Sequence, residues 1–187
     1  MPDRCCRSSQ DHQRIGREAE LAWLARKLAV ALLALLVVVP AVAAERVVTL
    51  APHLAELVCE AGGCQRLVGV VAYTDTPPAA AAKPQVGNAF AVNLENLLAL
   101  RPDWILAWDG GTPPATVERL RDLGMQVDVI AIRGLDDVGS ALQRIGAGIG
   151  TTAQAEAAVR DYRARLTALR ERYRGRARLR VFYQIET

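Results

Sequence analysis

Short apolar runs of strand length alternate along the chain with longer stretches whose apolar residues recur at helical spacing. The expected strands are Arg46–Leu50, Leu67–Ala72, Trp104–Trp108 and Gln126–Ile132, and the expected helices are Leu54–Glu60, a short helix after Asn93, Pro113–Leu123 and Asp136–Ile149. Strands that alternate with helices are typical of a parallel sheet with right-handed crossovers. We therefore predict the α/β fold class, with a parallel-sheet, Rossmann-like lobe over residues 45–150.

The third expected strand is the most informative of the four. Trp104–Trp108 is apolar throughout, as expected of a strand that is covered on both faces. The chain turns at Asp-Gly-Gly directly afterwards, and Thr112 is the expected N-cap of a helix that begins with two prolines. Because open α/β sheets bind ligands at the carboxyl ends of their strands, we expect Trp108 to line a binding cleft and Trp104 to lie in the core.

The short helix before this strand has a clear expected start. Asn93 is a favourable N-cap, and Leu94, Leu97 and Leu98 share one helical face that we expect to point inward. Glu95 then points to solvent in the first turn, where a carboxylate gains about 0.3–1 kcal/mol from the helix dipole.

The first 44 residues have the pattern of an export signal. Arg26 and Lys27 precede the apolar run LAVALLALLVVV, and small residues follow from Ala41 to Ala44. These are the charged, apolar and cleavage regions of a secretory signal peptide. The apolar run is short for a bilayer span, which needs about 20 residues, although an uncleaved anchor stays an alternative. We predict a cleaved signal peptide over residues 1–44.

Cysteine use fits export to an oxidising compartment. Cys5 and Cys6 fall in the leader, which leaves Cys59 and Cys64 on either side of two glycines. The glycines let the chain bend enough to bring the two sulfurs together, so a disulfide is plausible. Two separate thiols are the alternative.

A long helix with a different pattern follows the sheet-forming region. Thr151 and Gln154 form an expected capping box. Apolar residues then repeat at spacings of four and three, at Ala155, Val159, Tyr162, Leu166, Leu169 and Tyr173. A helix over residues 151–175 would be about 35 Å long, enough to connect two lobes. Gly175 ends it, and Leu179–Gln184 is an expected strand with no later strand to join, so we interpret residues 176–187 as the start of a truncated C-terminal lobe.

Four motifs carry a resemblance to a known family: RVVTLAP, YTDTPP, NLENLLALRPD and AWDGG. Through them the chain from Arg46 to Gln184 resembles the N-terminal lobe of the two-lobed, helical-backbone periplasmic binding proteins, and among these the cobalamin binders of vitamin-uptake ABC transporters. The resemblance implies a monomeric, periplasmic, non-enzymatic protein without a cofactor. It would capture cobalamin or a related corrinoid and deliver it to an inner-membrane permease. Siderophore or haem binding on the same scaffold is the alternative, and a secreted enzyme or regulatory domain with a flavodoxin-like sheet is a hypothesis of another class.

The resemblance also implies which residues contact the ligand. Pro52, Tyr73 and Trp108 match family positions that bind the corrin ring, and each lies just past an expected strand. Aromatic faces suit a flat, largely apolar macrocycle because they bury a large area with few rotamers to freeze. The sequence departs from the family at Ala89, where relatives carry a tryptophan, and Phe90 beside it is the candidate substitute.

Two polar residues have more than one interpretation. His53 follows Pro52 at the end of the first strand, and it is a plain loop histidine, a hydrogen-bond donor to ligand amides or an axial ligand to cobalt. Glu95 matches a family glutamate that docks onto arginines of the permease, which the resemblance adds to its helix-dipole role. Exposed charge pairs of this kind affect register and association rate more than affinity.

Several other functions lack their motifs. The chain has no G-x-S-x-G elbow, no P-loop and no G-x-G-x-x-G after a strand. A zinc or manganese importer would need three or four metal ligands, and His53 is the single histidine after the leader, so we expect no metal site. The formal net charge is +3. The arginines of the last helix flank an apolar stripe, so we interpret them as a solvated face and not as a nucleic-acid site.

Overall fold

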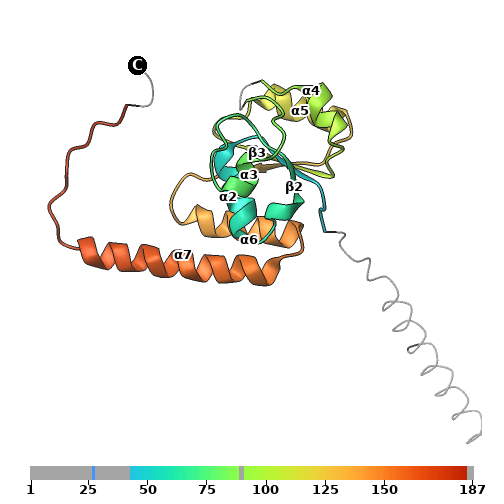
Figure 1. Ribbon diagram of the computed structural model, residues 1–187. Coiled ribbons are helices and arrows are strands. Elements are labelled where there is room, and N and C mark those ends of the chain that lie inside the picture. Colours follow the sequence, from blue (N-terminus) through green and yellow to red (C-terminus); the bar gives the residue numbers. More distant parts are fainter. Residues whose placement is uncertain (1–26, 28–42, 89–90, 185–187) are drawn as a thin grey trace, which may run out of the picture. The chain divides into compact units, whose positions relative to one another are not determined.

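The body of the protein is built on a four-stranded sheet in which all strands are parallel (Figure 1). The computed structural model describes residues 27, 43–88 and 91–184. The strands are β1 (Val47–Thr49), β2 (Leu67–Gly69), β3 (Trp104–Trp108) and β4 (Val127–Ile130), in the order β2-β1-β3-β4. The predicted parallel α/β lobe is confirmed, with β2 and β4 as the edge strands.

Helices pack on both faces of this sheet, and their apolar residues form two cores. The first core takes residues from α2 (Pro52–Glu60), α6 (Asp137–Gly148) and α7 (Thr152–Tyr173). The second takes residues from α4 (Leu94–Ala99) and α5 (Pro114–Asp122). The short elements η1 (Cys64–Arg66) and α3 (Pro78–Ala81) complete the described body.

Strand β3 contributes side chains to both cores because successive side chains of a strand point to opposite faces. Trp104 and Leu106 are buried in the first core, whereas Ile105 and Ala107 are buried in the second. The predicted core position of Trp104 is therefore confirmed, at 3% exposure. Trp108, at the end of the strand, is only half-buried.

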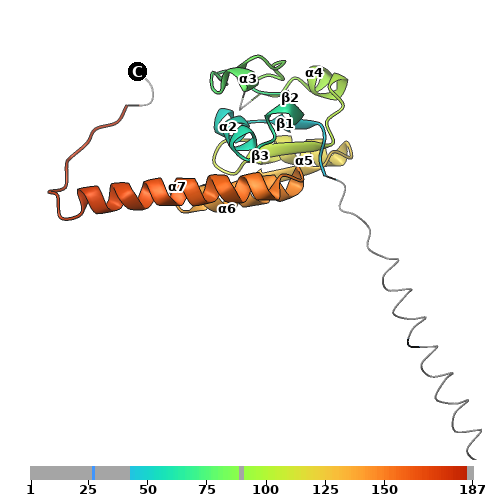
Figure 2. The same ribbon diagram turned by 60° about the horizontal axis from the view of Figure 1, so that its bottom comes forward.

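Helices α6 and α7 lie side by side at a very close approach (Figures 1 and 2). A Cβ atom at Gly146 would lie 2.2 Å from the Cβ of Ala155, so only glycine fits at this crossing. Thr151, between the helices, donates its hydroxyl hydrogen to the carbonyl of Ala61 at 2.6 Å. The predicted capping box is therefore wrong, since the hydroxyl serves a tertiary hydrogen bond and caps no backbone N–H of α7.

A disulfide bond joins Cys59 to Cys64 at the end of α2. The intervening turn uses Gly62 at φ 87°, a left-handed conformation that glycine adopts without the steric cost of a Cβ. The backbone N–H of Gly63 donates to the carbonyl of Val58 and closes the turn.

The sequence predictions for α4 and α5 are correct in part. The side chain of Asn93 accepts a hydrogen bond from the N–H of Asn96 at 3.1 Å, so the predicted N-cap is confirmed. Leu98, predicted to face inward, is 49% exposed, and Leu97 is the one fully buried residue of α4. Thr112 is not the N-cap of α5; its hydroxyl instead accepts a hydrogen bond from the N–H of Trp108.

The segment after α7 differs from its prediction. Residues 179–184 form no strand within the described chain, because no neighbouring strand pairs with them there. Their large apolar side chains are exposed, with Phe182 at 87%. No helix among the described residues has both the length and the apolar character to cross a membrane.

Removal of this exposed segment is expected to increase solubility. Adjacent exposed apolar side chains with unpaired backbone groups promote aggregation. A chain ending at Arg174 should therefore stay monodisperse at higher concentration than the 187-residue chain, as measured by light scattering after concentration. A chain ending at Gln184 keeps Phe182 and its neighbours and is the matched control. Equal aggregation of the two shortened chains would contradict the prediction.

Candidate functional site

The carboxyl ends of the strands bring the predicted ligand residues to one edge of the sheet. Tyr73 lies in the turn after β2, Pro52 begins α2 after β1, and Trp108 ends β3. Because the strands are parallel and ordered β2-β1-β3, these residues follow the same order along the edge, with Pro52 in the middle. The sheet topology thus aligns side chains that are far apart in the sequence.

Trp108 is held in place from three directions. Its indole forms an edge contact with the imidazole of His53, with ring centroids 5.0 Å apart and planes at 84°. The backbone of Gly110 and Gly111 packs against the same indole, since added Cβ atoms there would lie 2.8 Å and 2.3 Å from its ring carbons. The backbone N–H of Trp108 donates to the hydroxyl of Thr112 at 3.0 Å. The glycines of the AWDGG turn therefore leave room for the indole.

An ion pair fixes the turn behind Trp108. Arg133, in the loop after β4, lies 3.0 Å from the carboxylate of Asp109. The carboxylate of Asp137 accepts hydrogen bonds from the backbone N–H groups of Arg133 and Gly134 at 2.9 Å each. These contacts tie the loops after β3 and β4 together. Both charges of the ion pair are well exposed, so we assign it a positioning role and little stability.

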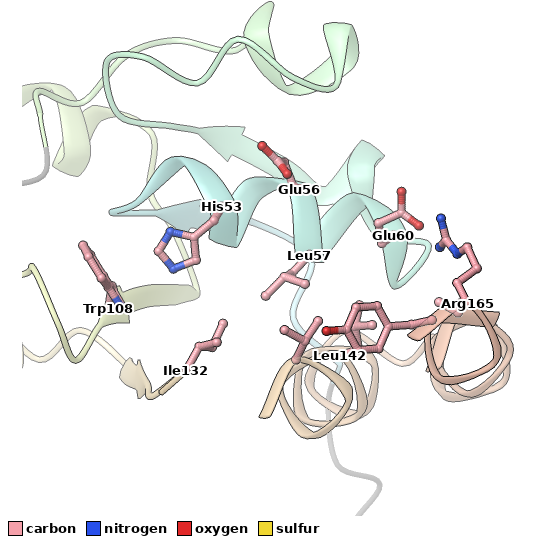
Figure 3. A pocket seen from close by; sticks show the side chains of 11 residues that line it. His53, Glu56, Leu57, Glu60, Trp108, Ile132, Leu142 and Arg165 are labelled. Carbon is pink, nitrogen blue, oxygen red and sulfur yellow. The ribbon is translucent and has the colours of Figure 1, made fainter. Parts of the chain in front are cut away.

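A pocket of about 420 Å³ extends from Trp108 along α2 towards α7 (Figure 3). Its wall is largely apolar. The lining residues are His53, Glu56, Leu57, Glu60, Trp108, Ile132, Val138, Leu142, Ala158, Tyr162 and Arg165. Helical periodicity predicted that α6 and α7 turn apolar residues inward. It could not predict which of these residues would line a pocket instead of packing against other side chains.

His53 is the polar residue that lines the pocket beside Trp108. Burial lowers the pKa of its imidazole below the usual range, and the neighbouring carboxylate of Glu56 opposes that shift. Within the described residues the imidazole has no hydrogen-bond partner, and its one ring contact is with Trp108. The lowered pKa favours the uncharged form of this half-buried imidazole, which lines the pocket.

The remaining predicted ligand residues differ in their surroundings. Tyr73 is 82% exposed and lies outside the pocket, on a backbone with φ 66° that a non-glycine residue rarely adopts. Pro52 is half-buried as the first residue of α2, where its ring suits the start of a helix. Phe90 and Ala89 lie outside the described residues.

Two further sequence predictions concern charge and metal. Glu95 is exposed in the first turn of α4, as its position in the helix pattern indicates. In the part of the chain that the structure describes, no group of three or more histidine, cysteine or acidic side chains could hold a metal ion.

Comparison with known proteins places this lobe in a family. A family model described as periplasmic binding protein matches residues 47–186. The vitamin B12-binding protein of Vibrio cholerae is 35% identical over 142 residues, which make up 76% of this chain and 51% of that protein. This chain therefore spans about half the length of the curated relatives it matches.

Two solved structures show the same architecture. The periplasmic vitamin B12-binding protein of Vibrio cholerae matches with a TM-score of 0.67 and 35% identity, covering 71% of this chain and 52% of that one. A periplasmic haem-binding protein of Pseudomonas aeruginosa matches with a TM-score of 0.64 and 32% identity, covering 68% and 46% respectively. Because the family model matches most of its length, and its fold is shared with solved relatives, this chain belongs to the periplasmic binding protein family.

Proposed function

We propose that this chain captures cobalamin or a related corrinoid and presents it to an inner-membrane ABC permease. The observation that carries the proposal is the half-buried indole of Trp108 at the edge of the sheet, beside His53 and in line with Pro52 and Tyr73. A flat macrocycle can cover these side chains at once, because they follow one another along adjacent strand ends. The similarity to vitamin B12-binding proteins supports a corrinoid as that macrocycle.

The shape of the site supports a ligand that is only partly enclosed by this lobe. Tyr73 exposes most of its ring, and the pocket beside Trp108 is open and largely apolar. Exposed aromatic residues beside an apolar pocket are typical of a binding surface. In our proposal the corrin ring lies over the strand ends, and a smaller apolar part of the ligand enters the pocket.

Titration of the chain with cyanocobalamin, haem and a ferric siderophore tests the ligand. Tryptophan emission should be quenched by the ligand that lies on Trp108, and we expect saturable quenching by cyanocobalamin. Haem binding on the same scaffold is the second candidate, favoured by the similarity to a haem-binding protein. Tight haem binding without cyanocobalamin binding would replace the corrinoid proposal.

We further propose that the chain is exported to the periplasm, loses its leader there and has no catalytic activity. The relatives are periplasmic binding proteins, and the leader has the three regions of a signal peptide. Mass measurement of the protein from a periplasmic extract tests cleavage, and incubation with corrinoids tests for chemical conversion. A product of altered mass that depends on the protein would favour the enzyme hypothesis.

Docking to the permease is expected to use Glu95. The carboxylate is exposed at the start of α4 and has no ion-pair partner among the described residues. Glu95→Ala should leave corrinoid quenching unchanged but lower corrinoid uptake into vesicles that contain the permease, with the largest difference at low salt because salt screens exposed charges. Glu118→Ala, on the exposed side of α5, is the matched charge control. Equal uptake by the two variants would contradict docking through Glu95 and leave only its interaction with the helix dipole.

A further inference from the structure

The chain that leads into β1 is bound to the body of the protein from Ala44 onward. The backbone N–H of Ala44 donates to the carbonyl of Gly148 at 2.8 Å. The carbonyl of Ala44 accepts a hydrogen bond from the guanidinium group of Arg66, also at 2.8 Å. The methyl group of Ala44 is half-buried and packs against the first core. The N–H, the carbonyl and the side chain of Ala44 therefore all contact the folded lobe.

The residues on either side of Ala44 differ in how they are held. The backbone N–H groups of Glu45 and Arg46 donate to the carboxylate of Asp103 at 2.9 Å and 3.0 Å. Ala43 lies close to Gly150, but it makes no hydrogen bond with any of the described residues. The hydrogen-bonded part of the chain thus begins between Ala43 and Ala44.

The same peptide bond fits the pattern that a signal peptidase recognises. Ala41-Val42-Ala43 is an A-x-A sequence just after the apolar run, and cleavage after its second alanine leaves Ala44 as the first residue. Cleavage one bond later would follow Val42-Ala43-Ala44, which begins with a valine.

The later bond is also less favourable for the folded lobe. Its cleavage would remove the donor to Gly148 and an acceptor of Arg66. In return, the new ammonium group of Glu45 would lie beside the carboxylate of Asp103. Because Asp103 is exposed, a charge pair there contributes little to stability.

We propose that a signal peptidase of the exporting cell hydrolyses the bond between Ala43 and Ala44, and that Ala44 then anchors the N-terminus of the mature lobe. This inference rests on the proposed export and names the bond at which the leader is removed. Water adds across the bond, so that Ala43 ends the leader with a carboxylate and the nitrogen of Ala44 becomes an ammonium group. Cleavage precedes the docking of Ala44, because the residue is half-buried once the lobe has folded.

The new ammonium group has a favourable partner in the fold. Gly148 is the last residue of α6, so its carbonyl lies at the negative end of the helix dipole. A cation is stabilised at this end of a helix. The ammonium group of Ala44 takes over the hydrogen bond that the backbone N–H donates to Gly148 in the uncleaved chain.

The intact mass of the exported protein identifies the cleaved bond. The full 187-residue chain is produced in a Gram-negative host, and the protein is recovered from the periplasm. We expect the mass of a chain that begins at Ala44. A mass smaller by one alanine residue, which means a start at Glu45, or a start at any other residue would overturn the inference and leave export in place. Absence of the protein from the periplasm, or retention of the whole leader, would overturn both.

Two matched substitutions distinguish the two neighbouring bonds. Ala43→Leu places a large residue where the peptidase requires a small one, so no product should begin at position 44. Ala44→Leu lies beyond the recognised pair of alanines, so cleavage should still occur before position 44. If Ala44→Leu blocks cleavage and Ala43→Leu does not, the peptidase cleaves after Ala44 and the inference is wrong.

The anchoring role of Ala44 has a separate test. Two chains are produced without the leader, one beginning at Ala44 and one at Glu45, and both are unfolded with urea under oxidising conditions. The chain that begins at Ala44 should unfold at the higher urea concentration, because it retains the contacts with Gly148 and Arg66. Equal midpoints would overturn the anchoring role.

Discussion

Replacing Trp108 by alanine is expected to weaken corrinoid binding by about 1–3 kcal/mol, a loss of about 5- to 150-fold in affinity. The indole is half-buried, lies against His53 and forms one end of the pocket. A macrocycle that covers this ring buries a large, rigid aromatic surface, which alanine cannot replace. Affinity is measured by calorimetry, because the substitution removes the fluorescent reporter.

The controls for this prediction come from the same site. Trp108→Phe keeps an aromatic face and should recover part of the lost affinity. Circular dichroism of both variants shows whether the sheet survives, as expected because Trp108 lies at the end of β3 and Trp104 provides the buried ring of that strand. If the Trp108→Ala protein is folded and its affinity is unchanged, Trp108 does not contribute to the binding site.

The largest expected effect on stability concerns the crossing of α6 and α7. Gly146→Ala would place a methyl group 2.2 Å from the Cβ of Ala155, and that atom is fixed on the helix backbone and cannot rotate away. The two helices would have to separate, at a cost typical of overpacking, about 1–3 kcal/mol in the free energy of unfolding. Chemical denaturation monitored by circular dichroism measures the change.

Gly139→Ala is the matched control on the same helix. An added Cβ there meets its nearest atoms, in the side chain of Arg163, at 3.5 Å, which is ordinary van der Waals contact. Alanine is favoured over glycine inside a helix by about 0.5–1 kcal/mol. We therefore expect Gly139→Ala to raise stability and Gly146→Ala to lower it. The same sign for both variants would mean that helix propensity, and not the close approach, decides the effect.

The fold class and the position of most elements, to within about three residues at each end, followed from the sequence because they depend on local patterns. The apolar run Trp104–Trp108 has the bounds of β3 itself, and its burial on both faces follows from the absence of polar residues. Asn93 caps α4 as predicted because an N-cap needs only a side chain and a backbone N–H three residues away. Neighbours in sequence determine such features.

Polar side chains with a choice of partners were less predictable. The hydroxyls of Thr151 and Thr112 were both expected to cap helices. In the structure Thr151 donates to Ala61, 90 residues away, and Thr112 accepts from Trp108. A sequence pattern shows which local partner is available but not which distant carbonyl or N–H the fold will bring closer.

The candidate site also combines features that local sequence determines with features that depend on tertiary packing. Strand ends are visible in the sequence, and the resemblance to periplasmic binding proteins implied that Pro52, Tyr73 and Trp108 at these ends contact the ligand. The contact of His53 with Trp108 and the open apolar wall between α2 and α7 depend on how the helices pack after the chain has folded. The sequence by itself determined which residues lie at strand ends, because the alternation of apolar runs and turn residues is local, whereas the strand order β2-β1-β3-β4 that sets these ends side by side is tertiary. Tertiary packing alone decided which of them touch, how His53 is buried and where a pocket remains.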